Sequence, residues 1–187
     1  MKRTGDLSAN ALKKELIVRV EATSTARPET VYGLLADLSS HLVWAGERQS
    51  NRTRLLTLDP PTAPAAVGTE WRSTGSDPMG TFSDRSVVTE ATRAKAFEFV
   101  TEAHLVTKRG QEVDWTNVHR YELSPDGDGS RIVYTLRLTR ISRLIGMLGA
   151  FGVPGLRALA LKASARMTRR GVRNLVRLAE EREAGGR

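Results

Sequence analysis

The 187-residue sequence contains no cysteine and only three histidines. The missing cysteines exclude disulfide frameworks, thiolate zinc sites, iron–sulfur clusters and cysteine nucleophiles, and three scattered histidines argue against a metal centre. No stretch approaches the roughly 20 apolar residues that span a bilayer, and residues 1–10 lack the apolar core of a signal peptide. We therefore expect a cytoplasmic protein with no metal and no tightly held cofactor.

Basic residues exceed acidic ones by eight, and the excess lies entirely in the C-terminal quarter. Residues 1–139 hold 18 Lys and Arg against 18 Asp and Glu, which leaves 11 basic and 3 acidic residues for 140–187. This distribution predicts either a solvated basic helix face or a salt-sensitive contact with an anionic partner. Because the arginines are not interleaved with aromatic residues that stack on bases, we expect no nucleic-acid binding.

The first third of the chain predicts one strand followed by short helices. Apolar and polar residues alternate at 16–22, which is typical of a half-buried strand. Pro28 and Glu29 then indicate a helix start, and a second short helical piece is expected at 39–43. A strand at 54–58 and a loop to residue 66 follow.

The middle of the chain predicts an antiparallel meander, and the end predicts a long helix. The expected strands are 69–74, 81–90, 96–107, 112–123 and 131–141. The Asp126–Gly129 sequence favours a hairpin turn, because it lacks the spaced carboxylates and closing Glu of a calcium loop. Residues 154–183 predict a helix about 45 Å long. Apolar residues occupy much of its circumference, so we expect it to be buried on most sides.

This element order predicts an α+β helix-grip architecture, in which a curved seven-stranded antiparallel sheet wraps around the C-terminal helix. We expect one domain at 12–183, a flexible tail at 1–11 and a frayed end at 184–187. The stretch Ser24–Leu38, followed by Trp44, resembles the opening signature of the START-like SRPBCC superfamily, specifically its polyketide cyclase/dehydrase-like branch. Weaker similarities are at 87–90, 121–125, 129–132 and 171–175.

The resemblance implies a cavity between the sheet and the long helix that holds lipids, polyketides or other apolar small molecules. Some relatives are enzymes, and many only bind. Independently, Trp115, Asn117, His119 and Tyr121 share one strand face, which mixes aromatic rings with polar tips as ligand pockets do. The candidate ligand-binding residues are Trp44, Trp71, Ser73, Phe97, Phe99, Trp115, Asn117, His119, Tyr121, Tyr134, Leu136 and Met167. The alternative is an ordinary core with internally satisfied polar groups.

Catalytic motifs are absent from the sequence: it has no nucleophile elbow, phosphate-binding loop or metalloprotease helix motif. His119 is the candidate catalytic residue, as a general acid/base or as a group that orients a ligand carbonyl, and a structural role in the core is the alternative. His41 is expected in solvent, and His104 is expected to face outward. In a polyketide cyclase-like enzyme, Arg, His or Tyr would polarise a carbonyl of a folded poly-β-ketone, and Arg85 belongs to a strand of the expected sheet.

The segment Arg143–Val153 is apolar and rich in glycine, and it directly precedes the basic helix. Two interpretations remain open. In the first, Arg143–Val153 and the basic helix face make weak contact with an anionic membrane. In the second, the segment covers the mouth of the cavity or forms a dimer contact. Oligomeric state and ligand identity are not determined by the sequence.

Overall fold

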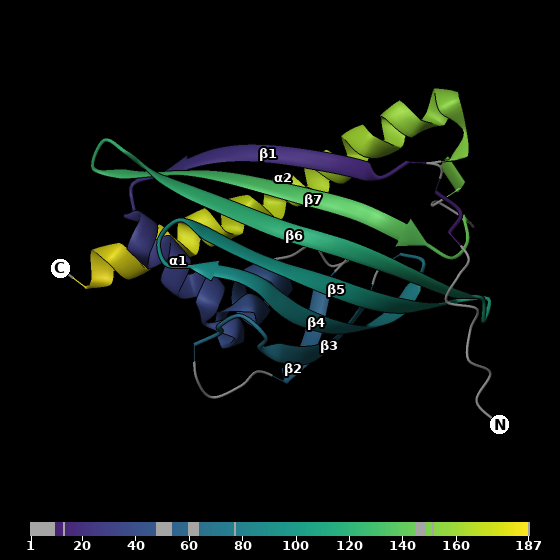
Figure 1. Ribbon diagram of the computed structural model, residues 1–187, viewed down its shortest axis with the longest axis horizontal. Coiled ribbons are helices and arrows are strands. Elements are labelled where there is room, and N and C mark those ends of the chain that lie inside the picture. The colour runs from purple at the N-terminus through teal and green to yellow at the C-terminus, as the bar shows by residue number, and fades with distance from the viewer. Residues whose placement is uncertain are drawn as a thin grey trace.

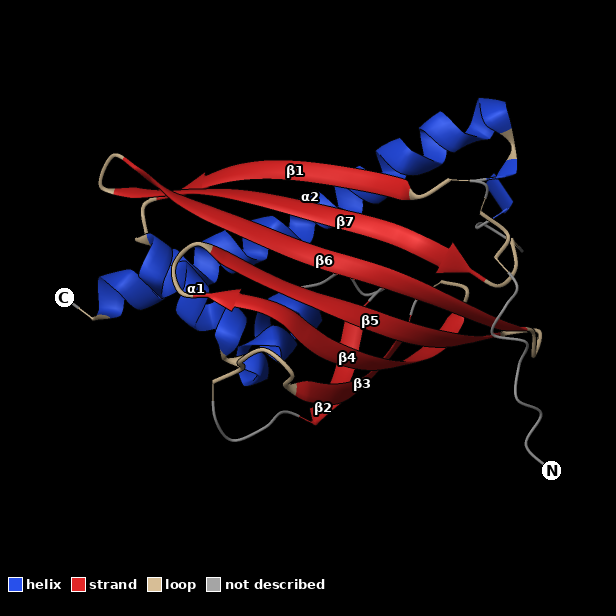
Figure 2. Ribbon diagram, in the orientation of Figure 1, coloured by secondary structure: helices blue, strands red, loops and turns tan. Residues whose placement is uncertain are grey.

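The computed structural model describes residues 10–12, 14–47, 54–59, 64–76, 78–144, 149–150 and 152–186. Seven strands form one antiparallel sheet in the order β1-β7-β6-β5-β4-β3-β2, and a long helix passes diagonally behind it (Figures 1 and 2). The strands are β1 (Leu16–Ser24), β2 (Arg54–Asp59), β3 (Glu70–Ser76), β4 (Gly80–Thr92), β5 (Ala96–Thr107), β6 (Glu112–Asp126) and β7 (Gly129–Ile141). The helical elements are α1 (Pro28–Ala36), a 3₁₀ turn η1 (Leu38–Ser40), a π-helical turn η2 (Leu42–Glu47) and α2 (Pro154–Gly185). The predicted helix-grip α+β architecture is confirmed.

The first and last strands are neighbours in the sheet. β1 pairs with β7 from Leu16 opposite Leu138 to Ser24 opposite Ser130, without interruption. The side chains of β1 alternate as the sequence predicts, with Leu16 buried and Ile17 55% exposed. The helical elements and β2 carry the chain from β1 to the opposite edge, from which the remaining strands return as a meander.

The Asp126–Gly129 sequence forms the expected hairpin turn between β6 and β7. Asp126 pairs with Gly129, and Gly127 adopts a φ of +58°, which favours glycine. Gly129 also lies against the end of β1, because a Cβ there would come 2.0 Å from the Ser24 carbonyl oxygen. The turn therefore fixes this corner of the sheet over the start of α1.

The long helix α2 has a buried C-terminal half and an exposed N-terminal half. Val172, Leu175 and Ala179 are at most 2% exposed, whereas Leu156 and Leu159 are 48% and 66% exposed. The prediction of a helix buried on most sides is therefore wrong for the first half. Figure 1 shows the reason: α2 extends beyond β1, where the sheet has ended.

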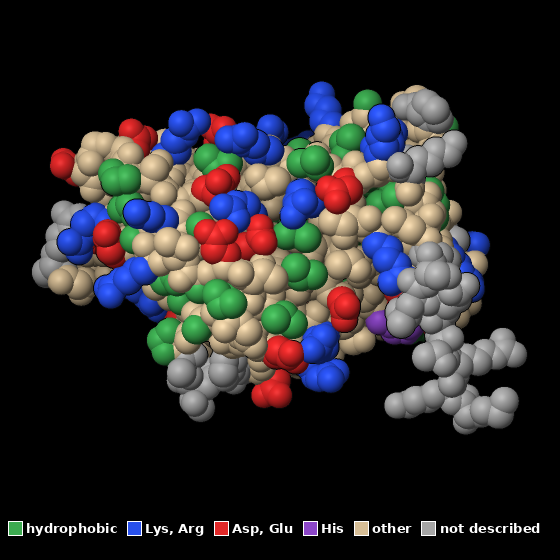
Figure 3. All heavy atoms as spheres, viewed as in Figure 1, with side chains coloured by type: hydrophobic (Ala, Val, Ile, Leu, Met, Phe, Trp, Pro, Cys, Tyr) green, Lys and Arg blue, Asp and Glu red, His purple; other side chains and the backbone are tan. Residues whose placement is uncertain are grey.

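Charged side chains of both signs are scattered over the outer face of the sheet, between hydrophobic and other groups (Figure 3). Arg120 on β6 forms ion pairs with Glu90 and Glu98, and Arg85 on β4 pairs with Glu70. Arg85 thus lies on the outer face, away from α2. In the described part of the chain, no helix has the length and apolar character that a membrane crossing needs.

Candidate functional site

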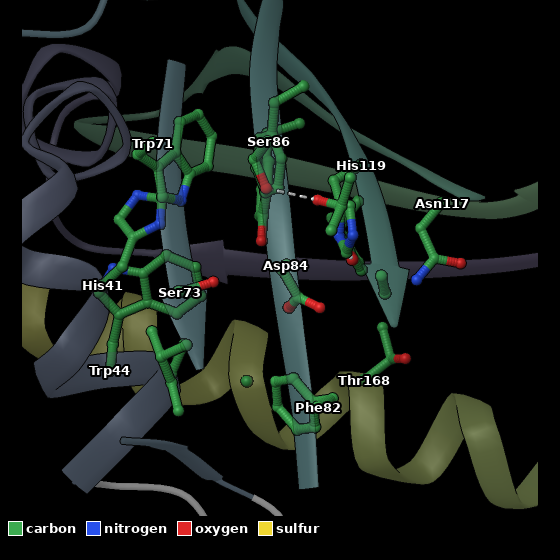
Figure 4. A pocket seen from close by; sticks show the side chains of 18 of the residues that line it. His41, Trp44, Trp71, Ser73, Phe82, Asp84, Ser86, Asn117, His119 and Thr168 are labelled. Atoms are coloured by element: carbon green, nitrogen blue, oxygen red, sulfur yellow. Dashed lines mark hydrogen bonds between the residues drawn. The ribbon is translucent and has the colours of Figure 1, made fainter. Parts of the chain in front are cut away.

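A cavity of about 300 Å³ lies between the concave face of the sheet and α2 (Figure 4). Ten of the twelve candidate ligand-binding residues line it: Trp44, Trp71, Ser73, Phe99, Trp115, Asn117, His119, Tyr121, Tyr134 and Met167. Strands β3 to β7 supply most of the wall, η2 closes one side, and α2 contributes residues 167, 168, 171 and 172. The cavity is therefore built where the buried half of α2 begins.

Cross-strand register explains why these side chains meet. Residues directly opposite each other in an antiparallel sheet project to the same face. One row on the concave face runs from Trp71 through Ser86 and Thr101 to Asn117. The next row places Phe99 opposite His119. The hydroxyls of Ser86 and Thr101 hydrogen-bond each other at 2.8 Å, so this buried polar pair is satisfied within the wall.

Aromatic rings form most of the inner surface. Trp71 and Phe99 meet edge to face with ring centroids 5.1 Å apart, and His41 lies 4.7 Å from Trp44. The His119 ring stacks on Phe99 at 4.5 Å with the two planes only 8° apart. Such stacked and edge-to-face contacts are the favoured arrangements of aromatic pairs, so much of the cavity wall is a layer of packed rings.

His119 is neutral and has a fixed orientation. Burial lowers the pKa of His119 to about 3, and the Tyr134 hydroxyl lies 2.7 Å from its Nδ1. Hydrogen bonding with Tyr121 lowers the pKa of Tyr134, although burial raises it more strongly. We assign the chain as Tyr121 donating to Tyr134, and Tyr134 donating to Nδ1. The single imidazole proton then resides on Nε2, which has no hydrogen-bond partner among the described residues.

His41 corrects the expectation of a solvated residue, because it is only 4% exposed and lines the cavity. Its Nε2–H donates to the Leu35 carbonyl oxygen at 3.0 Å, and burial lowers its pKa to about 4. The polar sequence of this piece was misleading, since its backbone turns inward between α1 and η2. There, η2 is held against α2 by Asn174, whose amide donates to the Trp44 carbonyl oxygen at 3.1 Å.

Asp84 is the functional candidate that sequence reasoning missed. It lines the cavity from β4, and no described residue forms a hydrogen bond with its buried Oδ1. Burial raises the pKa of Asp84 to about 7. Alternation along β4 could have identified it, because Asp84 lies two residues from both Phe82 and Ser86, which also face the cavity. The Trp44 indole Nε1 is the second buried polar atom of the cavity wall that lacks a partner among the described residues.

A second, more apolar cavity of about 170 Å³ adjoins the first. Trp115 and Asn117 line both cavities and so form the boundary between them. Leu136, predicted to bind ligand, lies in this second space. Phe97, the remaining candidate, lies in neither cavity: it is fully buried and packs edge to face against Tyr32 at 6.1 Å.

Other sequence candidates lie away from the cavity or outside the described residues. His104 is partly exposed, as expected for an outward side chain, and its Nδ1 lies 2.8 Å from an Asp114 carboxylate oxygen. Among the described residues, no group of His, Asp and Glu side chains is placed to hold a metal. Within the segment expected as a lid or membrane contact, residues 145–148 and 151 lie outside the described residues.

Comparison with known proteins identifies the fold and leaves the activity open. No family model and no curated protein matches the chain. An uncharacterised protein from Rhizobium leguminosarum matches with a TM-score of 0.65 and 13% identity, over 91% of this chain and 97% of that one. Major latex-like protein 151 from Panax ginseng matches with a TM-score of 0.57 and 9% identity, over 88% and 97%. DynU16, described as a putative protein in the dynemicin biosynthetic locus, matches with a TM-score of 0.51 and 16% identity, over 89% of this chain and 48% of that one. At these identities the likeness concerns the fold alone.

Proposed function

We propose that this protein is a START-like SRPBCC domain that binds an apolar or amphipathic small molecule between its sheet and α2. The observation that carries the proposal is the 300 Å³ cavity, whose aromatic walls surround a few inward-facing polar groups. Small-molecule sites in proteins have this size and composition. A core packed for stability alone would leave no such space beside a buried carboxyl oxygen that has no hydrogen-bond partner among the described residues.

The two adjoining cavities favour an amphipathic ligand. The larger one offers rings and the polar groups of Asp84, Asn117 and His119, whereas the smaller one is lined mainly by aliphatic side chains. A ring system in the first and an aliphatic substituent in the second, passing Trp115, would match both surfaces. Lipids and polyketide-like molecules have this character.

A polyketide cyclase/dehydrase-like enzyme is the second candidate function, and the hydrogen-bonded chain from Tyr121 through Tyr134 to His119 favours it. His119 Nε2–H would donate to a ligand carbonyl, and negative charge that develops on that oxygen during enolisation would strengthen the bond. The Asp84 carboxyl group would exchange protons with the ligand, because its pKa of about 7 suits both directions of transfer near neutral pH.

A fluorescence titration tests the binding proposal. N-phenyl-1-naphthylamine, an apolar probe that brightens out of water, should bind with one-to-one stoichiometry and raise the melting temperature. At a probe concentration of 100 Kd the stabilisation should be about 2.7 kcal/mol. Trp115→Glu should abolish binding, because it places a charge between the two cavities. Ile17→Glu, at an exposed position on β1, is the control and should bind as the parent does.

Absence of saturable binding in the folded parent would contradict the proposal. The membrane contact of Arg143–Val153 and the basic helix face stays a prediction, and the ligand proposal does not depend on it.

A further inference from the structure

Asp84 occupies a central position on the concave face of the sheet. It lies opposite Ser73 on β3 and opposite Ala103 on β5. Figure 4 shows its carboxyl group in the space between β4 and α2, near Phe82 and Thr168. Any molecule that fills the larger cavity therefore contacts this group.

Among the residues that the structure describes, none that lines the cavity carries a positive charge to compensate Asp84. The described lining residues include no Lys or Arg. The titratable groups among them are His41, His119, Tyr121 and Tyr134, and burial keeps each of these neutral at pH 7. From α2 the lining residues are Met167, Thr168, Gly171 and Val172, none of which carries a charge. A carboxylate without a donor is costly to bury, and no described residue donates to Oδ1 of Asp84, so a bound molecule that donates a hydrogen bond there would lower this cost.

The cavity has polar groups in two separate places, Asp84 in one and His119 in the other. Along the register, Asp84 is opposite Ala103, Ala103 is opposite Trp115, and His119 lies four residues further along β6. With ordinary sheet spacings the Cα atoms of Asp84 and His119 are roughly 15 Å apart. Asp84 and the Nε2–H of His119 thus face different parts of one ligand, with the aromatic wall between them.

We propose that Asp84, in its ionised form, accepts a hydrogen bond from a hydroxyl or ammonium group on an aromatic ligand of this cavity. The inference rests on the proposed ligand-binding function and adds the chemical class of the ligand: a ring compound with a hydrogen-bond donor at its edge. A bond from such a donor to a carboxylate is charge-assisted and about twice as strong as a neutral one. An ether or a ketone cannot supply it.

The pH dependence of binding follows from the burial of Asp84. Its pKa of about 7 in the empty protein means that the carboxyl group is largely protonated at pH 5 and largely ionised at pH 8. A ligand that binds only the ionised form gains affinity as pH rises, by up to tenfold for each unit below pH 7, and reaches a plateau above it. A ligand that needs the protonated form shows the opposite trend.

A matched set of naphthalene probes tests the inference. The set is 2-naphthol, which donates, 2-methoxynaphthalene, which only accepts, and 2-naphthylmethylamine, which donates as a cation. Fluorescence titrations between pH 5 and pH 8 should show 2-naphthol binding at least about tenfold tighter than the methyl ether at pH 8. The affinity of the naphthol should rise with pH, whereas that of the ether should not, because only the protonated carboxyl group can donate to an ether oxygen. The amine arm distinguishes the donor: binding tighter than the naphthol identifies ammonium, and weaker binding identifies hydroxyl.

Two variants assign the effect to this carboxyl group. Asp84→Asn should weaken 2-naphthol binding at pH 8 by about tenfold and flatten its pH dependence. Asp84→Leu should remove the preference for the naphthol altogether. Asp59→Asn, at an exposed position on β2, is the control and should behave as the parent. Circular dichroism establishes that each variant is folded.

The outcomes separate this inference from the proposed function. Equal binding of naphthol and ether, or naphthol affinity that falls as pH rises, overturns the role of ionised Asp84 while leaving ligand binding intact. Failure of all three probes to saturate the folded parent contradicts the proposed function itself.

Discussion

Nδ1 of His119 lies 2.7 Å from the Tyr134 hydroxyl, and the two residues come from neighbouring strands, β6 and β7. With Tyr134 assigned as the donor, the imidazole proton lies on Nε2, and the His119 ring stacks on Phe99. His119 therefore presents one oriented N–H donor, a property that serves both binding and proton transfer.

Replacement of His119 distinguishes binding from catalysis. In the binding account, His119→Gln changes the affinity for N-phenyl-1-naphthylamine by less than about tenfold, because one neutral hydrogen bond is worth roughly 1 kcal/mol. Neither the parent nor the variant should then cyclise a synthetic poly-β-ketone. Cyclised product from the parent would favour the enzyme instead, provided that His119→Gln lowers the rate of its formation by about 100-fold or more. Chromatography with mass detection measures the product.

Removal of the Tyr134 hydroxyl should destabilise the fold. Tyr134→Phe leaves the buried Nδ1 without a donor, which should lower the free energy of unfolding by about 1 to 3 kcal/mol in urea denaturation. Tyr32→Phe, at a partly buried position beside Phe97, is the control and should cost less. If the two variants cost the same, the hydrogen bond to His119 does not stabilise the protein.

The pH dependence of stability combines two opposite contributions. The pKa values of His41 and His119 are lowered to about 4 and about 3, so their contribution is present above pH 6.5 and is lost as pH falls. The pKa of Asp84 is raised from 3.8 to about 7, so its contribution is present below pH 3.8 and is lost as pH rises through 7. Between about pH 4.5 and pH 6, the unfolded chain thus binds two extra protons at the histidines and one fewer at Asp84.

Asp84→Asn removes only the carboxyl contribution. The free energy of unfolding of the variant should therefore rise with pH more steeply than that of the parent, by about 1.4 kcal/mol per pH unit in this window. Urea denaturation at pH 4.5, 5.25 and 6 measures both slopes, and contributions from all other groups cancel in their difference. Equal slopes would show that Asp84 is ionised at acidic pH.

The two halves of α2 should respond differently to the same substitution. Leu175→Ala removes a fully buried side chain and should cost about 2 to 5 kcal/mol in the free energy of unfolding. Leu159→Ala, at a position that is 66% exposed, should change it by less than about 0.5 kcal/mol. Similar losses in both variants would mean that the first half of the helix is also covered, by a partner or a second copy.

Local pattern was sufficient to predict most of the fold. Alternation along β1 and β3 correctly gave the inward faces of Val18, Trp71 and Ser73, because side-chain direction in a strand depends only on parity. Burial of His41 was not predictable, since its short helical piece is polar and only its packing beneath Trp71 and Trp44 makes it part of the wall. Exposure of Leu156 and Leu159 was missed for a related reason: an apolar helix face does not reveal how far the opposing sheet extends.

The central claim is that the cavity between the sheet and α2 holds a small molecule. Native mass spectrometry of gently purified protein tests this claim most directly. The account predicts a one-to-one complex whose added mass is released on denaturation, and whose released compound contains aromatic rings and a hydroxyl or amino group. Trp115→Glu should be recovered without the added mass, and Ile17→Glu with it. Recovery of the folded parent at the mass of the bare chain, together with no saturable binding of N-phenyl-1-naphthylamine, would contradict the claim.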